Sequence, residues 1–315
     1  MSIAAYLKEI GRGQKGARAL SRDQANDLLS RVLDGRVSDV ELGAFAIAMR
    51  IKGETRDEML GFLDAVQARL ARLPDLGVTT VVLPSHNGAR RLPLATPLLA
   101  LLLARAGVPV VVHGSQTVDG RVCSAQVFEA LGITPARAMQ APGPGQCVYI
   151  PTHVLCPALQ RLLDLRRALG VRNPAHSLVK LINPCAGRAL LVVSYTHPDY
   201  ATVYADTLMA AGAHAMLLRG SEGEPVADPR RVPQIDIIEH GTRRVVQVGE
   251  EGPVVAVPPL PLKLTPEANA DLIRAILDGQ RPLPHPLSLQ VEHILQQLHV
   301  RAPAAATHPQ PRYGS

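Results

Sequence analysis

Aromatic residues are scarce in this chain. It has no tryptophan, three phenylalanines and six tyrosines in 315 residues. Proteins that read the base sequence of single strands stack the bases on exposed aromatic rings. So few rings argue against a protein that recognises single-stranded sequences in that way.

Cysteine is also scarce, and its spacing excludes the common metal motifs. The four residues Cys123, Cys147, Cys156 and Cys185 form no C-x-x-C pair and have no histidines at zinc-finger spacing. Buried, reduced thiols are the simpler interpretation. We therefore expect no metal and no cofactor.

Long apolar runs are absent. The longest, residues 96–104, is far shorter than the about 20 residues that a membrane-spanning helix needs. The first residues lack the charged start and long apolar stretch of a signal peptide. These absences predict a soluble, cytoplasmic protein that does not bind membranes.

The overall composition is that of a globular protein, with 47% hydrophobic and 19% charged residues. Lysine and arginine number 33 against 27 acidic residues, for a net charge of +6 and a pI near 9.4. A mild basic excess is compatible with a nucleic-acid ligand, with an acidic small molecule, or with neither.

The first 73 residues predict a unit made of helices. Three capping boxes, Ser21-x-x-Gln24, Ser38-x-x-Glu41 and Thr55-x-x-Glu58, each precede apolar residues at helical spacing. Glycines at 35 and 53 end the helical segments, and a shorter helix is expected over residues 3–10.

After residues 74–77 the pattern changes to alternating strands and helices. Short apolar runs predict strands at 78–83, 108–112, 147–150, 189–193 and 214–218, and a hairpin over 235–239 and 243–248. Helices are expected from Thr96-Pro97, over 124–131, 157–169 and 198–211, and near 266–277 and 287–298. Such alternation predicts an α/β fold with a mostly parallel sheet, followed by a disordered tail at 301–315.

Several strings resemble the anthranilate phosphoribosyltransferase family, which is glycosyl transferase family 3. The family stretch K-H-G-N-R is matched by Val112-His113-Gly114-Ser115-Gln116, and its S-A-x-x-x-E-A-L-G by residues 124–132. Residues 165–173, Asn183-Pro184 and His197-Pro198-Asp199 match further family segments. The resemblance covers roughly residues 1–280.

The resemblance implies a fold of the class III phosphoribosyltransferase and nucleoside phosphorylase type. It implies a small helical domain, residues 1–74, completed by helices near 152–185. The larger α/β domain would then comprise residues 75–151 and 186–300.

The phosphate loop of the family is not preserved. A phosphoribosyltransferase of this family holds the diphosphate of its donor on a G-T-G-G-D loop, where small residues let backbone N–H groups approach phosphate. This chain has Leu83-Pro84-Ser85-His86-Asn87-Gly88-Ala89-Arg90-Arg91 instead. Pro84 has no N–H, and the side chains at 83–86 are expected to obstruct the approach.

Two further parts of the transfer mechanism are also changed. Val112, Ser115 and Gln116 replace the lysine, asparagine and arginine of K-H-G-N-R. Residues 221–229 contain no adjacent acidic pair of the kind that holds Mg²⁺ in the family. We therefore expect the ancestral activity to be lost and predict no catalytic residues.

These departures resemble the YbiB-type branch of the family. The matching strings are residues 8–13, 84–90, 170–173 with Ala175-His176, and Pro233-Gln234-Ile235. The resemblance implies a homodimer that binds DNA and RNA with little sequence preference.

The first candidate contacts lie between residues 8 and 22. Lys8, Arg12, Lys15 and Arg18 belong to a stretch whose five basic residues face one acid, Glu9, for a net charge of +4. Glycines at 11, 13 and 16 predict a flexible loop, which can follow a phosphate backbone without reading bases. The alternative is a solvated loop whose charges only aid solubility.

Further candidate contacts are Arg90, Arg91, Arg166 and Arg172. Arg90 and Arg91 are expected at the old cleft, where guanidinium pairs suit phosphate, and Arg166 matches the arginine that meets the acceptor's carboxylate in the family. For each, an ion pair between the domains is the alternative. Asn87, His113, Gly114 and Arg167 are interpreted as remnants of the ancestral cleft, and His86, His176 and His197 as structural residues.

The sequence thus predicts a non-catalytic homodimer that binds nucleic acids through basic residues on a degenerate phosphoribosyltransferase scaffold. Two alternatives stay open: an active phosphoribosyl or pentosyl transferase with an altered acceptor, and a protein-interaction module built on a former enzyme.

Overall fold

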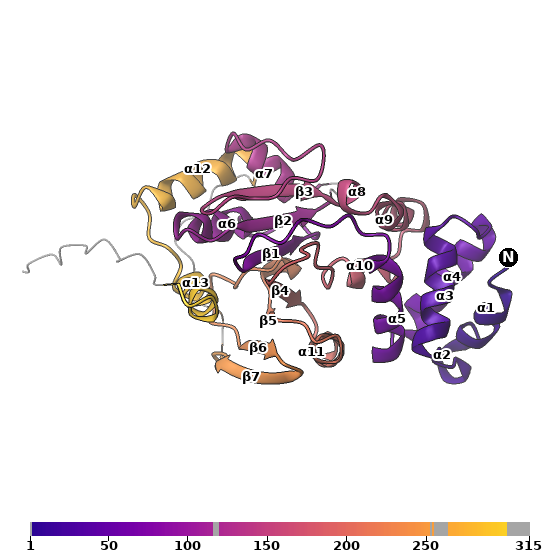
Figure 1. Ribbon diagram of the computed structural model, residues 1–315. Helices are drawn as coiled ribbons and strands as arrows, with labels where there is room; N and C mark the ends of the chain where they lie inside the picture. The colour runs from indigo at the N-terminus through magenta and orange to yellow at the C-terminus, as the bar shows by residue number, and fades with distance from the viewer. Residues whose placement is uncertain (1, 116–119, 253, 255–263, 301–315) are drawn as a thin grey trace, which may run out of the picture.

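The computed structural model of the protein describes residues 2–115, 120–252, 254 and 264–300. A helical domain lies beside a larger α/β domain whose sheet is covered by helices (Figure 1). This confirms the predicted fold class. The predicted tail, 301–315, lies outside the described residues.

Five helices form the N-terminal domain: α1 (Ala4–Ile10), α2 (Gly13–Gly16), α3 (Arg22–Leu33), α4 (Asp39–Lys52) and α5 (Arg56–Gln67). All three predicted capping boxes are present at the starts of α3, α4 and α5. The expectation of a flexible loop around Gly13 is wrong, because residues 13–16 form the helical turn α2. This turn packs against α4, and the N–H of Arg18 donates to the carbonyl of Glu9 at 3.0 Å.

The α/β domain contains one seven-stranded sheet in the order β3-β2-β1-β4-β5-β6-β7. Its strands are β1 (Thr80–Ser85), β2 (Val110–Gly114), β3 (Cys147–Pro151), β4 (Ala189–Tyr195), β5 (Ala215–Arg219), β6 (Ile235–Glu239) and β7 (Thr242–Gln247). The first five are parallel, and β6 and β7 form the predicted antiparallel hairpin. The sheet is therefore mostly parallel, as its buried apolar strands predict.

The remaining elements cover the sheet or connect its strands. They are α6 (Thr96–Arg105), α7 (Ser124–Ala130), α8 (Thr152–Leu155), α9 (Pro157–Leu169), α10 (Ala175–Leu178), α11 (Pro198–Ala210), the 3₁₀ turn η1 (Ser221–Gly223), α12 (Pro266–Leu277) and α13 (His285–Gln297). None of the helices in the described ranges is long and apolar enough to cross a bilayer.

Alternate residues of the strands fill two separate cores. Val82 belongs to the core that contains α11 and the helical domain, whereas Val81 and Leu83 belong to the core under α6, α7, α12 and α13. This alternation is the period-2 pattern of a strand buried on both faces. Because the first core continues from the sheet into Phe45 and Phe62, it holds the helical domain against the α/β domain.

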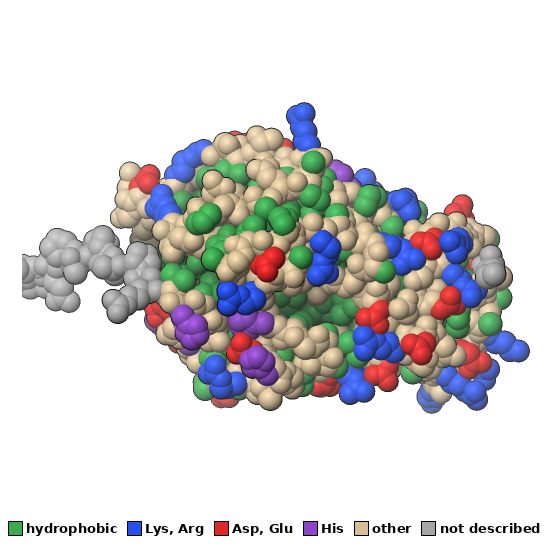
Figure 2. Space-filling view, viewed as in Figure 1, with side chains coloured by type: hydrophobic (Ala, Val, Ile, Leu, Met, Phe, Trp, Pro, Cys, Tyr) green, Lys and Arg blue, Asp and Glu red, His purple; other side chains and the backbone are tan. Residues whose placement is uncertain are grey.

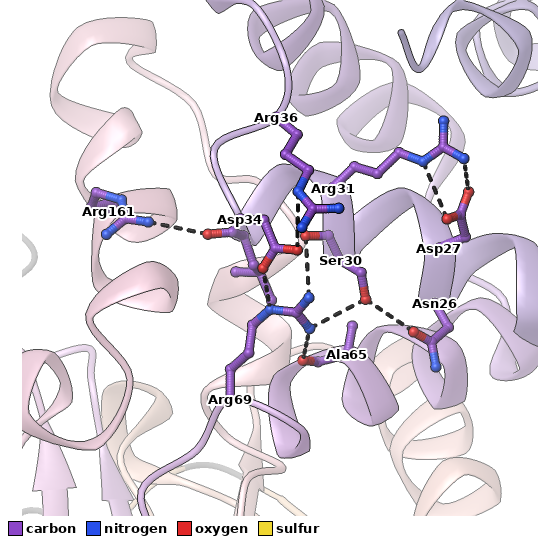
Figure 3. A network of polar contacts seen from close by, with 10 residues as sticks. Asn26, Asp27, Ser30, Arg31, Asp34, Arg36, Ala65, Arg69 and Arg161 are labelled. Atoms are coloured by element: carbon purple, nitrogen blue, oxygen red, sulfur yellow. Dashed lines mark hydrogen bonds and ion pairs between the residues drawn. The ribbon is translucent and has the colours of Figure 1, made fainter. Parts of the chain in front are cut away.

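A polar network adds to this packing within the helical region (Figure 3). The guanidinium of Arg69 donates to Asp34 at 2.7 Å, to Ser30 at 3.2 Å and to the carbonyl of Ala65 at 2.8 Å. Arg161 of α9 donates to the carbonyl of Leu33 at 3.1 Å, at the end of α3. The network therefore ties α9 to the N-terminal helices.

Candidate functional site

The loop after β1 surrounds a buried carboxylate from the same chain. Glu224 is 1% exposed, and its Oε1 accepts the backbone N–H of Asn87 at 2.7 Å and of Gly88 at 2.8 Å. Its Oε2 accepts the hydroxyl of Thr96 at 3.0 Å and that of Ser85. Four donors therefore converge on one side chain that arrives from the turn after β5.

A second carboxylate from that turn meets the next part of the loop. Glu222 accepts the backbone N–H of Arg90 at 2.6 Å and that of Arg91 at 3.1 Å. Its backbone has a φ of +51°, in the left-handed region that side chains other than glycine rarely adopt. Such a conformation persists where the surrounding contacts hold it, here the two N–H groups.

The N–H donors of this loop follow the segment 83–86, whose side chains were expected to obstruct a phosphate. The N–H groups at 87, 88, 90 and 91 all point at carboxylates. Pro84 does not prevent this, because it lies within β1, before the turn that presents these donors. The N–H groups of the loop thus bind anionic groups, and these are the carboxylates of Glu222 and Glu224 from the same chain.

Two histidines lie in contact beneath this loop. The Nε2 of His86 is 3.3 Å from the Nδ1 of His113, and both rings are buried. Burial lowers the pKa of His113 to about 4 and holds that of His86 well below its usual range, so both are neutral near pH 7. The neighbouring Gly114 allows β2 to approach, since a Cβ there would lie 2.0 Å from the carbonyl oxygen of Ser85.

A cluster of three arginines lies beside the same loop. Arg121 donates to the carbonyls of Asn87 at 3.4 Å and Gly88 at 3.2 Å, and Arg172 donates to the side-chain oxygen of Asn87 at 3.3 Å. Burial lowers the pKa of Arg166, and Arg121 lowers it further. Burial, Arg166 and Arg121 together lower the pKa of Arg172.

The charges of this cluster are not neutralised within the fold. Arginine stays protonated despite such shifts. Within the described ranges, no carboxylate lies at ion-pair distance from Arg121, Arg166 or Arg172. Partly buried cations without acidic partners are costly, which is typical of a site built for an anion.

Lys180 adds another buried cation close by. Its Nζ donates to the carbonyls of Ser194 at 3.2 Å and Gly223 at 3.0 Å, and burial lowers its pKa to about 8. Lys180, Arg172 and His176 line a small cavity whose other walls include Tyr195, Tyr200 and Tyr204, half of all the tyrosines in the chain. The scarce rings are thus concentrated next to the cationic cluster.

Sequence reasoning missed Arg121 and Lys180. Lys180 stands in an otherwise apolar run, residues 178–182, and a lone charge in such a run is a signal that could have been used. Arg121 has no comparable signal, because a single arginine in a polar loop is ordinary.

The predicted contacts fall on two separate surfaces. Arg90 and Arg91 are exposed in the loop after β1, and Arg166 and Arg172 belong to the arginine cluster beside that loop. Lys8, Arg12, Lys15 and Arg18 are exposed on α1, α2 and the next turn, at the end of the helical domain farthest from the sheet (Figure 1). Arg167 is exposed, and Gln116 lies outside the described residues.

The N-terminal group is partly neutralised. Glu9 lies 2.9 Å from Arg12 and 3.7 Å from Arg18. On the face drawn in Figure 2, side chains of both charges are mixed over the helical domain, and a hollow with hydrophobic side chains lies over α11 and the neighbouring strands. The helical domain therefore presents no continuous basic surface on that face.

The residues of the cleft do not fit a magnesium-bound diphosphate. The donors at 87, 88, 90 and 91 already bind carboxylates, and Glu222 and Glu224 are turned toward those donors. The described part of the chain contains no group of three or more metal-binding side chains.

Comparison with known proteins places this geometry in a family. Residues 4–70 match the helical bundle domain of the glycosyl transferase family, and residues 93–297 match its a/b domain. An uncharacterized protein of Escherichia coli, YbiB, is 42% identical, with 92% of each chain covered. Anthranilate phosphoribosyltransferase of Methanopyrus kandleri is 31% identical over 89% of this chain and 84% of its own.

Solved structures agree on the fold. Anthranilate phosphoribosyltransferase of Thermus thermophilus superposes with a TM-score of 0.69 at 22% identity, covering 95% of this chain and 90% of that one. The Saccharomyces cerevisiae enzyme in complex with PRPP and Mg gives a TM-score of 0.68 at 13% identity, covering 95% and 89%.

Proposed function

The chain belongs to the glycosyl transferase family, and on this premise we propose that it binds DNA and RNA without sequence preference, as a cytoplasmic homodimer that has lost phosphoribosyl transfer. The observation that carries the proposal is the cleft itself. The loop after β1 is filled by Glu222 and Glu224, while the three arginines beside it have no acidic partner within the described residues.

The filled loop supports the loss of donor binding. A diphosphate would have to displace Glu224, which accepts four hydrogen bonds in a buried position. Hydrogen bonds to charged groups contribute about 1.5–3 kcal/mol each, so this displacement is expensive. Repulsion between the carboxylates and the incoming phosphates adds to the cost.

The arginine cluster supports binding of a polyanion. Guanidinium groups bind phosphate through paired N–H donors, and the one hydrogen bond that Arg172 makes among the described residues goes to the neutral side chain of Asn87. Backbone phosphates carry no sequence information, so such contacts predict affinity without specificity. Counterion release would drive the association.

The N-terminal surface supplies the second set of contacts. Lys8, Lys15 and Arg18 are exposed, and within the described residues Lys8 and Lys15 have no acidic partner at ion-pair distance. The N-terminal surface and the arginine cluster are far apart within one subunit. A nucleic-acid strand must therefore be long enough to reach both, or must contact the N-terminal surface of one subunit and the arginine cluster of the other.

Dimerisation is supported by an apolar surface on the helical domain. Ile47 and Ile51 are 40% and 56% exposed, and with Ala44 and Ala48 of α4 they line a groove against α1. Phe45 of the same helix is fully buried in the domain core and does not contribute to this surface. Exposed apolar side chains gathered at one place are typical of protein interfaces.

An experiment with matched variants tests nucleic-acid binding. Lys15→Ala with Arg18→Ala removes two proposed phosphate contacts, and Arg137→Ala with Arg244→Ala removes two exposed arginines elsewhere. The first pair is expected to weaken binding of an unrelated 20-nucleotide strand at 150 mM salt, and the second pair far less. Equal losses would mean that net charge alone is responsible.

The retained alternative is a working transferase with an altered acceptor, as the names of several relatives suggest. Calorimetry with phosphoribosyl diphosphate, with and without Mg²⁺, separates the two. We expect no magnesium-dependent binding. Micromolar, magnesium-dependent binding would reject the loss of transfer and favour the enzyme.

A further inference from the structure

A second cavity lies at the carboxyl ends of β4 and β5, on the side of β6. Its volume is about 520 Å³. Its lining includes Tyr195, Arg219, most of the segment 228–234, and Glu250, which follows β7. In open α/β sheets, ligands bind outside the carboxyl ends of the strands. The volume lies within the range of small-molecule sites, about 300–1,000 Å³.

The acidic residues that line this cavity are already bound within the fold. Both oxygens of Asp228 accept from Arg230, at 2.9 and 2.8 Å. Glu222 accepts the N–H groups of Arg90 and Arg91, and Glu250 accepts that of Val232 at 3.1 Å.

Two arginines that line the cavity lack such acidic partners. Across the described ranges, no carboxylate lies at ion-pair distance from Arg219 or Arg231. Arg231 donates through Nη2 to the carbonyl of Gly252, but its Nε is buried and has no hydrogen-bond partner in the described residues. A buried donor without a partner is costly, so the Nε of Arg231 favours an anion in this cavity, and Arg219 adds an exposed positive charge.

An aromatic ring stands next to one of these cations. Tyr195 and Arg219 are register partners in the parallel pair of β4 and β5, so their side chains lie side by side on one face of the sheet. Tyr195 is partly exposed. A tyrosine and an arginine side by side match a ligand that combines a flat base with a phosphate.

We propose that this cavity binds one nucleotide unit of a single strand, with its base against Tyr195 and its phosphate at Arg219 and Arg231. The inference rests on the proposed function and extends it to a preference for strands whose bases are free. Glu222 lines this cavity and also accepts the backbone N–H groups of Arg90 and Arg91. These two arginines therefore lie at the edge of the cavity, where they would hold the neighbouring phosphates of the strand.

Calorimetry with adenosine 5′-monophosphate, adenosine and inorganic phosphate tests the cavity directly. Arg219→Ala is expected to weaken binding of the monophosphate roughly tenfold or more, the worth of one charge-assisted contact. Tyr195→Leu keeps apolar volume and should weaken the monophosphate but not inorganic phosphate. Arg244→Ala, an exposed arginine outside the cavity, is the control and should bind as the wild type does.

Two results would overturn the inference: no binding of the monophosphate by the wild type, or equal losses in Arg219→Ala and Arg244→Ala. Binding of double-stranded DNA is measured in parallel, because a paired duplex cannot place a base in the cavity. This measurement distinguishes failure of the nucleotide pocket from failure of the proposed nucleic-acid binding. If duplex binds while the monophosphate does not, only the nucleotide pocket is rejected. If the monophosphate binds while neither duplex nor single strand does, the pocket stands and nucleic-acid binding is rejected.

Discussion

The carboxylate of Glu224 accepts the backbone N–H of Asn87 at 2.7 Å, within the loop that follows β1. The two residues are 137 positions apart, so the turn after β5 reaches across the carboxyl end of the sheet to fill the loop after β1. The loop after β1 is thereby joined to the turn after β5 through a buried side chain.

Removing this carboxylate should cost stability. In Glu224→Ala the buried N–H groups of Asn87 and Gly88 lose their acceptor, and we expect a loss of about 2–4 kcal/mol in the free energy of unfolding. Urea denaturation measures the loss, with the exposed Glu251→Ala as a control. A change below about 0.5 kcal/mol, the size of an ordinary surface substitution, would mean that the filled loop has no structural role.

Removing an arginine of the cluster should weaken nucleic-acid binding without lowering the thermal stability of the protein. Arg166→Ala relieves repulsion with Arg121 and Arg172, so we expect unchanged or slightly raised thermal stability together with roughly tenfold weaker nucleic-acid binding. Arg72→Ala is the contrasting variant, since Arg72 donates to the carbonyl of Cys185 at 3.1 Å and should cost stability without affecting binding. A marked fall in the melting temperature of Arg166→Ala would contradict the account.

Buried histidines should make the protein sensitive to acid. Burial and then Arg172 lower the pKa of His176 from an ordinary 6.5 to about 4. Between these values the unfolded chain binds more protons, so this contribution to stability is complete above pH 6.5 and is lost as the pH falls toward 4.

The variant His176→Asn should remove that part of the acid sensitivity, up to about 3 kcal/mol between pH 6.5 and 4. Thermal melts across this range measure it. His240→Asn is the control, because His240 is 89% exposed and its φ of +52° suits asparagine. An identical pH dependence in His176→Asn and the wild type would show that His176 is not held neutral.

The apolar groove on the helical domain should hold the dimer together. Ile47→Asp places a charge on this surface, and we expect it to give a monomer by light scattering at micromolar concentration, with the wild type a dimer. Val248→Asp is the control, because Val248 is 75% exposed on the distant hairpin side. A monomeric wild type would reject the homodimer.

Local signals in the sequence predicted the elements well. Ser21, Ser38 and Thr55 each begin a helix, because a capping box acts within four residues of chain. The turn α2 was missed because its glycines favour a loop locally, whereas packing against α4 stabilises the helical turn.

The site could be predicted only in part, because its contacts are distant in the sequence. The replaced loop and the missing acidic pair can be recognised in the amino-acid sequence itself. The hydrogen bond between Glu224 and Asn87 cannot, because it depends on the order of the strands in the sheet. Lys15 lies in α2 and Arg90 in the loop after β1, and these two elements belong to different domains (Figure 1), an arrangement that charge counts do not contain.

Binding of unrelated single- and double-stranded DNA and RNA, measured over a range of salt concentrations, tests the central claim most directly. If phosphates are contacted by about six residues (Lys8, Arg12, Lys15, Arg18, Arg90 and Arg91), log K should fall against log salt with a slope near −4 to −5, and affinity should hardly vary with base sequence. A shallow slope with no binding at 150 mM salt, or affinity that depends strongly on sequence, would contradict it.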